Sequence, residues 1–443
     1  MEDGTAKLTA MTQAAKEVPA RGRAVLGPAY QRVWWANTVS SVGDGAVTAA
    51  LPLLAVTITK DPRLIALVSA AFFLPWLLLS LPAGAVADRY DRVALMWRAQ
   101  AIQCVVVGLI AVLAAVGAAG IAVLVAAGFC LGAAEVVFSN AAQAELPRLV
   151  PAESLPKANG NLQVSLTLGE TFLGPPLGSV LFAAVRALPF GLDAGSFAAS
   201  AALLSGLPRR GSASGRRASA QSLRGSVMEG LRWLLRHRLL RIVAVLLGAA
   251  NFGSQMGQAT LVLLATQTLH VGASGYGLLW TAAAIGSILG GLANPAITRR
   301  VGEMPSLVIS MAAFAAVYVA IAFAPGALVL GLLMACNGFF VTMWNVVTVS
   351  LRQRIVPDEL LGRVNSVYRM IGWGLIPVGS LAGGFAARLG GLRAPYLAGG
   401  VVCGVALLVA LPGLLRARRS PDSPVPTATT EDPPKGKAGE PSC

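Results

Sequence analysis

Runs of predominantly apolar residues, separated by short polar stretches, fill most of the chain from residue 33 to residue 415. About twenty apolar residues are enough for a helix to cross a bilayer. We therefore predict an all-α membrane protein with twelve transmembrane helices. The runs cover residues 33–58, 63–86, 93–117, 121–143, 158–184, 187–207, 240–264, 274–298, 305–325, 327–349, 363–387 and 393–415.

Basic residues gather in alternate loops between these runs. One set of loops is rich in arginine, and residues 208–238 alone contain eight arginines. The other set of loops contains only Lys60, Arg63, Arg186, Arg388 and Arg393. Cytoplasmic loops of membrane proteins carry the excess of Lys and Arg. We therefore expect a multi-pass protein of the cell membrane with both termini in the cytoplasm.

The composition supports a membrane protein and excludes several other classes. Of the 443 residues, 55% are hydrophobic and only 12% are charged, whereas ordinary soluble domains carry about 25% charged residues. The net charge of +15 resides largely in the arginine-rich loops, so it does not indicate a nucleic-acid partner. No phosphate-binding loop or metal-ligand spacing is present. We expect no enzyme activity and no cofactor, and energy from an ion gradient, with protons as the expected ion.

The central polar segment divides the spans into two sets of six. Residues 222–237 place leucine and valine at helical spacing opposite arginine, which is typical of an amphipathic helix at a membrane surface. The tail after Arg419 is rich in Pro, Ser and Thr, which is typical of disorder. The expected organisation is a polar cytoplasmic tail (1–32), a six-helix bundle (33–207), a cytoplasmic linker with the amphipathic helix (208–239), a second six-helix bundle (240–415) and a disordered cytoplasmic tail (416–443).

The two halves are related by a repeat with a shift of 206 residues. The shift relates Gly84 to Gly290 and Gly178 to Gly384, and it carries the Val-Pro-x-Glu stretch at Val150 to Val356. Many membrane transporters are built from two such parallel repeats. The expected fold is therefore two six-helix bundles with a cavity between them.

A charged turn at residues 84–92 separates the second and third apolar runs. Its pattern of Gly84, Asp88, Arg89 and Arg92 resembles the signature of the major facilitator superfamily in the expected place. Asp91 departs from the family pattern, which has a small residue before the last arginine. Independently of the family, Gly84 is expected to let two helices approach closely. The resemblance implies a gating role, in which Asp88 braces the start of span eleven.

Other stretches resemble the macrolide-efflux and siderophore-exporter branch of the drug:proton antiporters in that superfamily. These are residues 41–45, 146–151, 192–197 and 229–233. A further pattern in span five resembles the family's antiporter motif, which is associated with export. It consists of Gly169, Gly174, Pro175 and Gly178. The prolines predict a kink, and the glycines predict tight helix packing.

Acidic residues inside apolar runs are the sharpest functional signal. Asp44, Glu135, Glu170 and Asp193 all fall in the N-terminal half. Charged groups within a bilayer are costly and suggest function. We expect these acids to couple protons or to bind a cationic substrate, with Asp44 and Glu170 as first candidates. For Asp193 a structural role and a functional role both remain open.

The C-terminal half has one charged residue well inside a predicted span. We expect its side chain to be buried and to pair with a carboxylate or a carbonyl oxygen, which can lie in the other half. The charged residue is Arg369 in span eleven. Polar and aromatic residues are further candidates for lining a substrate cavity, although the same residues serve equally well in packing. They are Asn337, Trp344, Asn345 and Trp373.

The sequence therefore predicts a secondary active transporter, expected to be a monomer in the lipid bilayer. It would export hydrophobic or amphipathic small molecules, such as antibiotics or other secondary metabolites, by proton-coupled antiport with alternating access. Two alternatives remain open. One is a siderophore exporter or an importer on the same fold, and the other is a membrane sensor that transports nothing.

Overall fold

The computed structural model describes residues 26–207 and 223–419, and every regular element in these ranges is a helix. Most of the two predicted tails, and residues 208–222 of the predicted linker, lie outside the described residues. The elements are α2 (Pro28–Ile58), α3 (Pro62–Arg89), α4 (Arg92–Ala115), α5 (Ile121–Leu149), η1 (Ala152–Ser154), α6 (Leu155–Leu166), η2 (Thr167–Leu173), α7 (Gly174–Ala184), α8 (Leu188–Ser205), α9 (Leu223–Arg236), α10 (Arg238–Gln258), α11 (Leu261–Leu263), η3 (Leu264–Thr268), α12 (Ala273–Val301), α13 (Glu303–Ala322), α14 (Ala327–Ile355), α15 (Asp358–Gly390) and α16 (Ala394–Arg419).

Ten helices in the described ranges are long and apolar enough to cross a membrane. The predicted count of twelve is therefore not confirmed, although the all-helical membrane fold is. The two remaining predicted spans fall on shorter elements. Residues 158–184 form α6, the π-helical η2 and α7, and residues 187–207 form α8. The backbone stays helical at both junctions of η2, and the adjacent prolines at the start of α7, which lack N–H donors, account for the change in hydrogen bonding within the fifth span.

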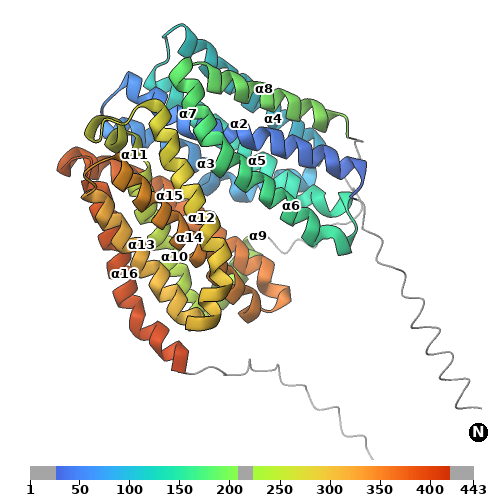
Figure 1. Ribbon diagram of the computed structural model, residues 1–443. Coiled ribbons are helices and arrows are strands. Elements are labelled where there is room, and N and C mark those ends of the chain that lie inside the picture. Colours follow the sequence, from blue (N-terminus) through green and yellow to red (C-terminus); the bar gives the residue numbers. More distant parts are fainter. Residues whose placement is uncertain (1–25, 208–222, 420–443) are drawn as a thin grey trace, which may run out of the picture.

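The helices form two groups that follow the chain. Figure 1 shows the blue-to-green helices α2–α8 on one side and the yellow-to-red helices α12–α16 on the other. We call these the N-terminal half (28–205) and the C-terminal half (238–419). The 206-residue repeat is visible in the packing. A Cβ on Gly132 of α5 would overlap the carbonyl oxygen of Phe72, and a Cβ on the equivalent Gly338 of α14 would overlap that of Ala283.

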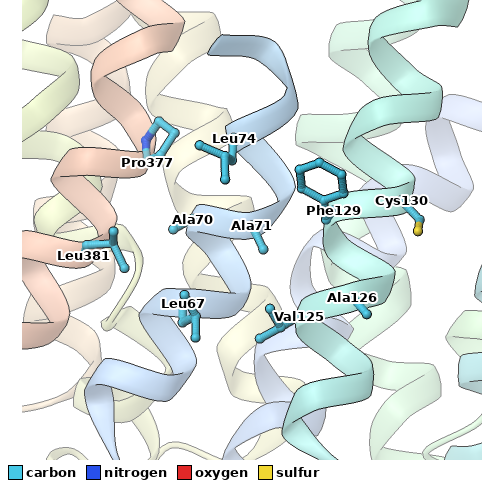
Figure 2. A pocket seen from close by; sticks show the side chains of 10 residues that line it. All are labelled: Leu67, Ala70, Ala71, Leu74, Val125, Ala126, Phe129, Cys130, Pro377 and Leu381. Carbon is cyan, nitrogen blue, oxygen red and sulfur yellow. The ribbon is translucent and has the colours of Figure 1, made fainter. Parts of the chain in front are cut away.

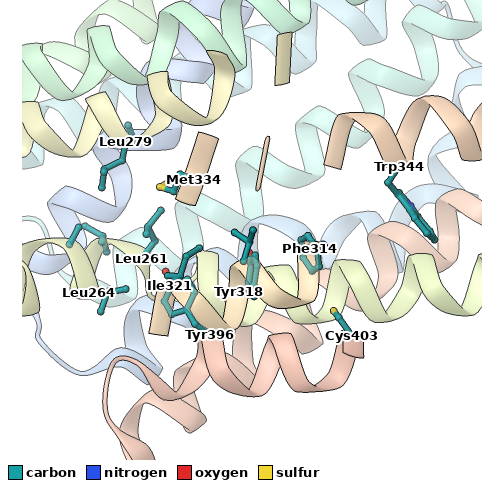
Figure 3. Packing of buried hydrophobic residues seen from close by; sticks show 14 of the residues in the cluster. Leu261, Leu264, Leu279, Phe314, Tyr318, Ile321, Met334, Trp344, Tyr396 and Cys403 are labelled. Carbon is teal, nitrogen blue, oxygen red and sulfur yellow. The ribbon is translucent and has the colours of Figure 1, made fainter. Parts of the chain in front are cut away.

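Aromatic side chains pack the interior of the C-terminal half (Figure 3). Phe314 stacks on Tyr318 with ring centres 4.6 Å apart, and Tyr318 lies 5.8 Å from Tyr396. The hydroxyl of Tyr318 donates a hydrogen bond to the carbonyl oxygen of Ser254 at 3.0 Å. This bond gives the buried hydroxyl a partner, so the aromatic group fixes α10, α13 and α16 to one another.

Two close contacts between the halves lie near the helix ends that are opposite Pro28 and Arg419. Gly384, near the end of α15, packs on the first turn of α3, where a Cβ would lie 3.0 Å from the carbonyl oxygen of Pro62. Gly277, near the start of α12, packs on α7, where a Cβ would lie 2.7 Å from that of Ser179. These two small-residue contacts bring the halves together at one end of the molecule.

The amphipathic helix predicted at residues 222–237 is α9, and it packs on the C-terminal half. Gly230 lies against the backbone of Arg363, and Nη1 of Arg363 is 2.5 Å from Oε2 of Glu229. Leu234 is almost completely buried, whereas Leu235 is exposed. The helix therefore has a protein-facing side as well as an exposed one.

Candidate functional site

Four carboxyl groups gather inside the N-terminal half. Asp44 lies on α2, Glu135 on α5, Glu170 on η2 and Asp193 on α8. Asp44 is close enough to the other three for their charges to interact, and Glu170 is within the same range of Glu135. The sequence predicts these acids as separate intramembrane groups, and the structure brings them together. We call them the carboxyl cluster.

Two glycines of α2 set Asp44 between its neighbours. Gly43 packs so closely on α8 that a Cβ on it would overlap Oδ1 of Asp193. Gly45 packs on η2, where a Cβ would lie 2.9 Å from Cα of Glu170. Glycine permits such close approach of backbones. The Gly-Asp-Gly sequence therefore positions Asp44 between the elements that carry two other acids.

The hydrogen-bond partners of the carboxyl cluster are neutral. The Nε2 group of Gln103 on α4 donates to Oε2 of Glu135 at 3.2 Å, and the hydroxyl of Ser196 donates to Oδ1 of Asp193 at 3.1 Å. In the described part of the chain, none of the ion pairs involves a member of the cluster. Charges within membrane-spanning segments are costly without a counter-ion, so the cluster favours a proton or the cationic group of a ligand.

Exposure differs among the four carboxyl groups. Asp193 is buried with 1% of its surface accessible, Asp44 and Glu135 are half-buried, and Glu170 is exposed. Glu170 lies in the π-helical segment, a local widening of the helix that often occurs at functional sites. The cluster thus runs from the interior to a group that is accessible from outside the protein.

Arg369 connects the two halves, but the prediction that it is buried is wrong. Its side chain is exposed, and Nη1 donates to Oε1 of Gln143 on α5 at 3.2 Å. The partner across the halves is therefore an amide carbonyl. The guanidinium also lies 5.9 Å from the ring centre of Trp76 on α3, which stacks on Trp373 of α15 at 4.6 Å. Arg369 thus belongs to a contact between the halves and not to the carboxyl cluster.

At the charged turn, the expectation of close helix approach at Gly84 is wrong. The nearest atom to a Cβ on Gly84 would be Oδ1 of Asn140, at 3.9 Å. The tight contact between α3 and α5 occurs instead at Gly132. Asp88 is the penultimate residue of α3, and its side chain lies outside the described residues, so its proposed bracing role stays a prediction.

The arginines and Asp91 of the turn have local structural contacts. The guanidinium of Arg92 donates to the carbonyl oxygens of Ala87 at 3.2 Å and Ala144 at 2.7 Å, which joins the turn to α5. Arg89 is exposed and ends α3. Asp91, the departure from the family pattern, is the N-cap of α4 and accepts a hydrogen bond from the backbone N–H of Ala94 at 2.8 Å.

The glycines of the antiporter-like motif pack directly on α2. A Cβ on Gly169 would overlap Oγ of Ser41, one on Gly174 would lie 2.5 Å from Cα of Gly45, and one on Gly178 would overlap the carbonyl oxygen of Ala46. Pro175 is buried at the start of α7. The motif therefore holds α2 beside the element that carries Glu170.

The four candidate lining residues have different surroundings. Asn337, Trp344 and Asn345 lie on α14, and Trp373 lies on α15. Trp344 belongs to the buried hydrophobic cluster (Figure 3), which fits packing better than lining. Asn337 is half-buried and Asn345 is exposed. Trp373 is 38% exposed and contacts Trp76 of the other half.

Several polar residues at these sites are not among the residues predicted from the sequence, because the prediction rests on charged side chains. Gln100 and Gln103 are buried on α4, and the Oε1 atom of each has no hydrogen-bond partner among the described residues. Gln143 binds Arg369. The sequence does contain a signal for these residues, because a glutamine within an apolar run is also costly to bury.

The comparisons with known proteins agree with this geometry. The sequence pattern of the transmembrane secretion effector family matches residues 25–433. The chain belongs to this family of the major facilitator superfamily. The resemblance inferred from the motifs is therefore confirmed at the level of the superfamily, and the protein is a multi-pass membrane transporter that acts on small-molecule substrates.

Two mycobacterial relatives align with most of this chain. The multidrug efflux pump Tap of Mycobacterium tuberculosis is 25% identical over 411 residues, which is 90% of this chain and 97% of Tap. An uncharacterized MFS-type transporter of the same organism is 30% identical over 376 residues, which is 78% of this chain and 82% of the relative.

Solved structures share the fold at low sequence identity. The nucleoside transporter NupG superimposes with a TM-score of 0.68 at 14% identity, covering 87% of this chain and 99% of NupG. A bacterial homologue of the iron transporter ferroportin has a TM-score of 0.66 at 17% identity, covering 86% of this chain and 98% of that one. These likenesses establish the transporter fold.

Proposed function

We propose that this transporter exports hydrophobic or amphipathic small molecules in exchange for protons. The observation that carries the proposal is the carboxyl cluster, whose hydrogen-bond partners are neutral. A carboxyl group in a medium of low dielectric constant binds a proton more readily than one in water. Protons and a cationic or amphipathic substrate then compete for the same acids, and this competition is the basis of antiport.

The direction of transport is supported by the efflux function named for Tap and by the antiporter-like motif next to Glu170. With both termini in the cytoplasm, as the arginine distribution favours, the contacts between α3 and α15 and between α7 and α12 close the outer end. Substrate then reaches the cluster from the cytoplasmic side. Protonation from outside releases it, and loss of the proton to the cytoplasm resets the carrier.

The proposal is tested by efflux of ethidium from resting cells that express the protein. We expect a protonophore to stop efflux, and Asp44→Asn and Glu170→Gln to abolish it while both variants remain inserted in the membrane. The matched control is Glu153→Gln, which removes an exposed acid of η1 outside the cluster and should leave efflux unchanged. Efflux that continues after collapse of the proton gradient would disprove coupling, and full activity of both cluster variants would remove the proposed site.

A further inference from the structure

An apolar groove crosses the boundary between the two halves on the outside of the protein. It lies between α3, α5 and α15 and has a volume of about 400 Å³ (Figure 2). Its lining side chains are apolar apart from the thiol of Cys130. Leu67, Phe129 and Leu381 are each more than one third exposed. Exposed apolar side chains on membrane-spanning helices are suited to contact with the hydrocarbon of lipids.

Two of the three helices carry an arginine where the groove reaches the helix end. On α3, Leu74, Ala70 and Leu67 lie on one face, and one turn further on that face is Arg63. On α15, Pro377 and Leu381 lie on one face that continues to Arg388.

The contact between the helices brings these two ends together. A Cβ on Gly384 of α15 would lie 3.1 Å from Cα of Arg63. Both arginines therefore lie at the mouth of the groove.

The mouth of the groove has an excess of positive charge. Arg63 pairs with Asp61 at 2.8 Å, and this bonding lowers the pKa of Asp61, with Arg388 contributing through its charge. Lys60 is exposed beside them. Arg63 and Arg388 thus act on a single carboxylate, an excess of one positive charge, and Lys60, next to Asp61 in the chain, is a further cation. Arg388 is exposed and takes part in none of the ion pairs found in residues 26–207 and 223–419.

We propose that the groove binds an anionic phospholipid. One acyl chain lies against Leu67, Leu74 and Leu381, and the phosphate group contacts Arg63 and Arg388. The helix ends lie at the level of the lipid headgroups, where an arginine guanidinium can form charge-assisted hydrogen bonds with a phosphate group. The positive mouth disfavours the cationic substrates proposed for the carboxyl cluster. Because the lipid touches α3 and α15 together, it stabilises the closed contact between the halves at this end.

Native mass spectrometry of the full-length protein, purified and incubated with phosphatidylglycerol or phosphatidylcholine, tests the headgroup contact. We expect the wild type to retain phosphatidylglycerol preferentially. Replacing both Arg63 and Arg388 with Gln should weaken phosphatidylglycerol binding by about 30-fold, since each cation near a membrane surface contributes about a factor of five. The matched control is Arg186→Gln, an exposed arginine in the turn between α7 and α8, which should change nothing.

A second variant tests the groove itself. Ala126 and Cys130 are exposed on α5 and line the groove, so Ala126→Phe with Cys130→Phe should fill it without disturbing the helix. This variant should lose retained phosphatidylglycerol, whereas Val105→Phe at an exposed position of α4 should not. Equal retention of both lipids by the wild type would overturn the proposal. The proposal would also be overturned if Arg186→Gln and the double arginine variant lost phosphatidylglycerol equally. Unchanged phosphatidylglycerol retention in the groove-filled variant would overturn it as well.

Discussion

Gly43 on α2 and Asp193 on α8 lie so close together that the glycine has no room for a side chain. A Cβ at Gly43 would overlap Oδ1 of Asp193 and would lie 2.5 Å from Oγ of Ser196. Asp193 itself is buried, and its Oδ1 accepts the hydrogen bond from Ser196. The packing of the two helices therefore determines the position of a carboxyl group.

Gly43→Ala should move Asp193 and separate α2 from α8. Forcing a methyl group into a filled interior costs about 1–3 kcal/mol, so we expect a lower thermal unfolding temperature and a loss of ethidium efflux. The measurements are thermal unfolding of the purified protein and efflux from cells. Gly191→Ala on α8 is the control, because its Cβ would have no neighbour within 4 Å. Wild-type behaviour of Gly43→Ala would show that the observed contact is wrong.

Gly178→Ala should separate α7 from α2 in the antiporter-like motif. Its Cβ would overlap the backbone carbonyl oxygen of Ala46, and a backbone atom cannot rotate away as a side chain can. We expect efflux to fall more than protein abundance, measured by dye efflux normalised to membrane-inserted protein. The comparison is Gly160→Ala on α6, where nothing lies within 4 Å of the added Cβ. Equal effects of the two substitutions would contradict the proposed packing role.

Arg369 and Gln143 should be energetically coupled across the two halves. Their hydrogen bond of 3.2 Å is exposed, and the guanidinium also contacts Trp76, so Arg369→Met should weaken this contact between the halves by about 1 kcal/mol. A double-mutant cycle with Gln143→Ala, measured by thermal unfolding in detergent, isolates the pair. Strictly additive effects would show that the two residues act independently.

Acid should loosen the junction between α9 and α10. His237 is the N-cap of α10, and its Nδ1 accepts a hydrogen bond from the backbone N–H of Leu240 at 3.3 Å. Burial lowers the pKa of His237, so the folded state binds a proton less readily than the unfolded state. Stability is therefore full at neutral pH and declines as the pH falls below the ordinary histidine pKa of about 6.5.

Hydrogen–deuterium exchange of residues 233–241 at several pH values measures this loss. Relative to the intrinsic exchange rate at each pH, which itself falls with the pH, we expect weaker protection at acid pH in the wild type. Protection should depend little on pH in His237→Asn, which keeps a capping oxygen but does not titrate. Protection that weakens equally in both proteins would assign the effect to another group.

The sequence by itself determined the elements and their chemistry. Hydrophobic runs of membrane-spanning length located the helices, because the bilayer requires every backbone polar group to be paired within a helix. The same runs made Asp44, Glu135, Glu170 and Asp193 conspicuous, since a charge is costly in that environment. The repeat and the motif at residues 84–92 identified the superfamily.

Only the tertiary structure decided which of these residues meet. The four acids come from four elements that are distant in the chain, so their spacing could not show that they form one cluster. Gly84 belongs to a motif and Gly132 does not, yet only Gly132 lies where another backbone passes. Arg369 has an apolar neighbourhood in the sequence, yet it is exposed and contacts Gln143 of the other half. Local patterns fix the hydrophobic face of a helix, whereas the partner that covers it depends on how all the helices pack.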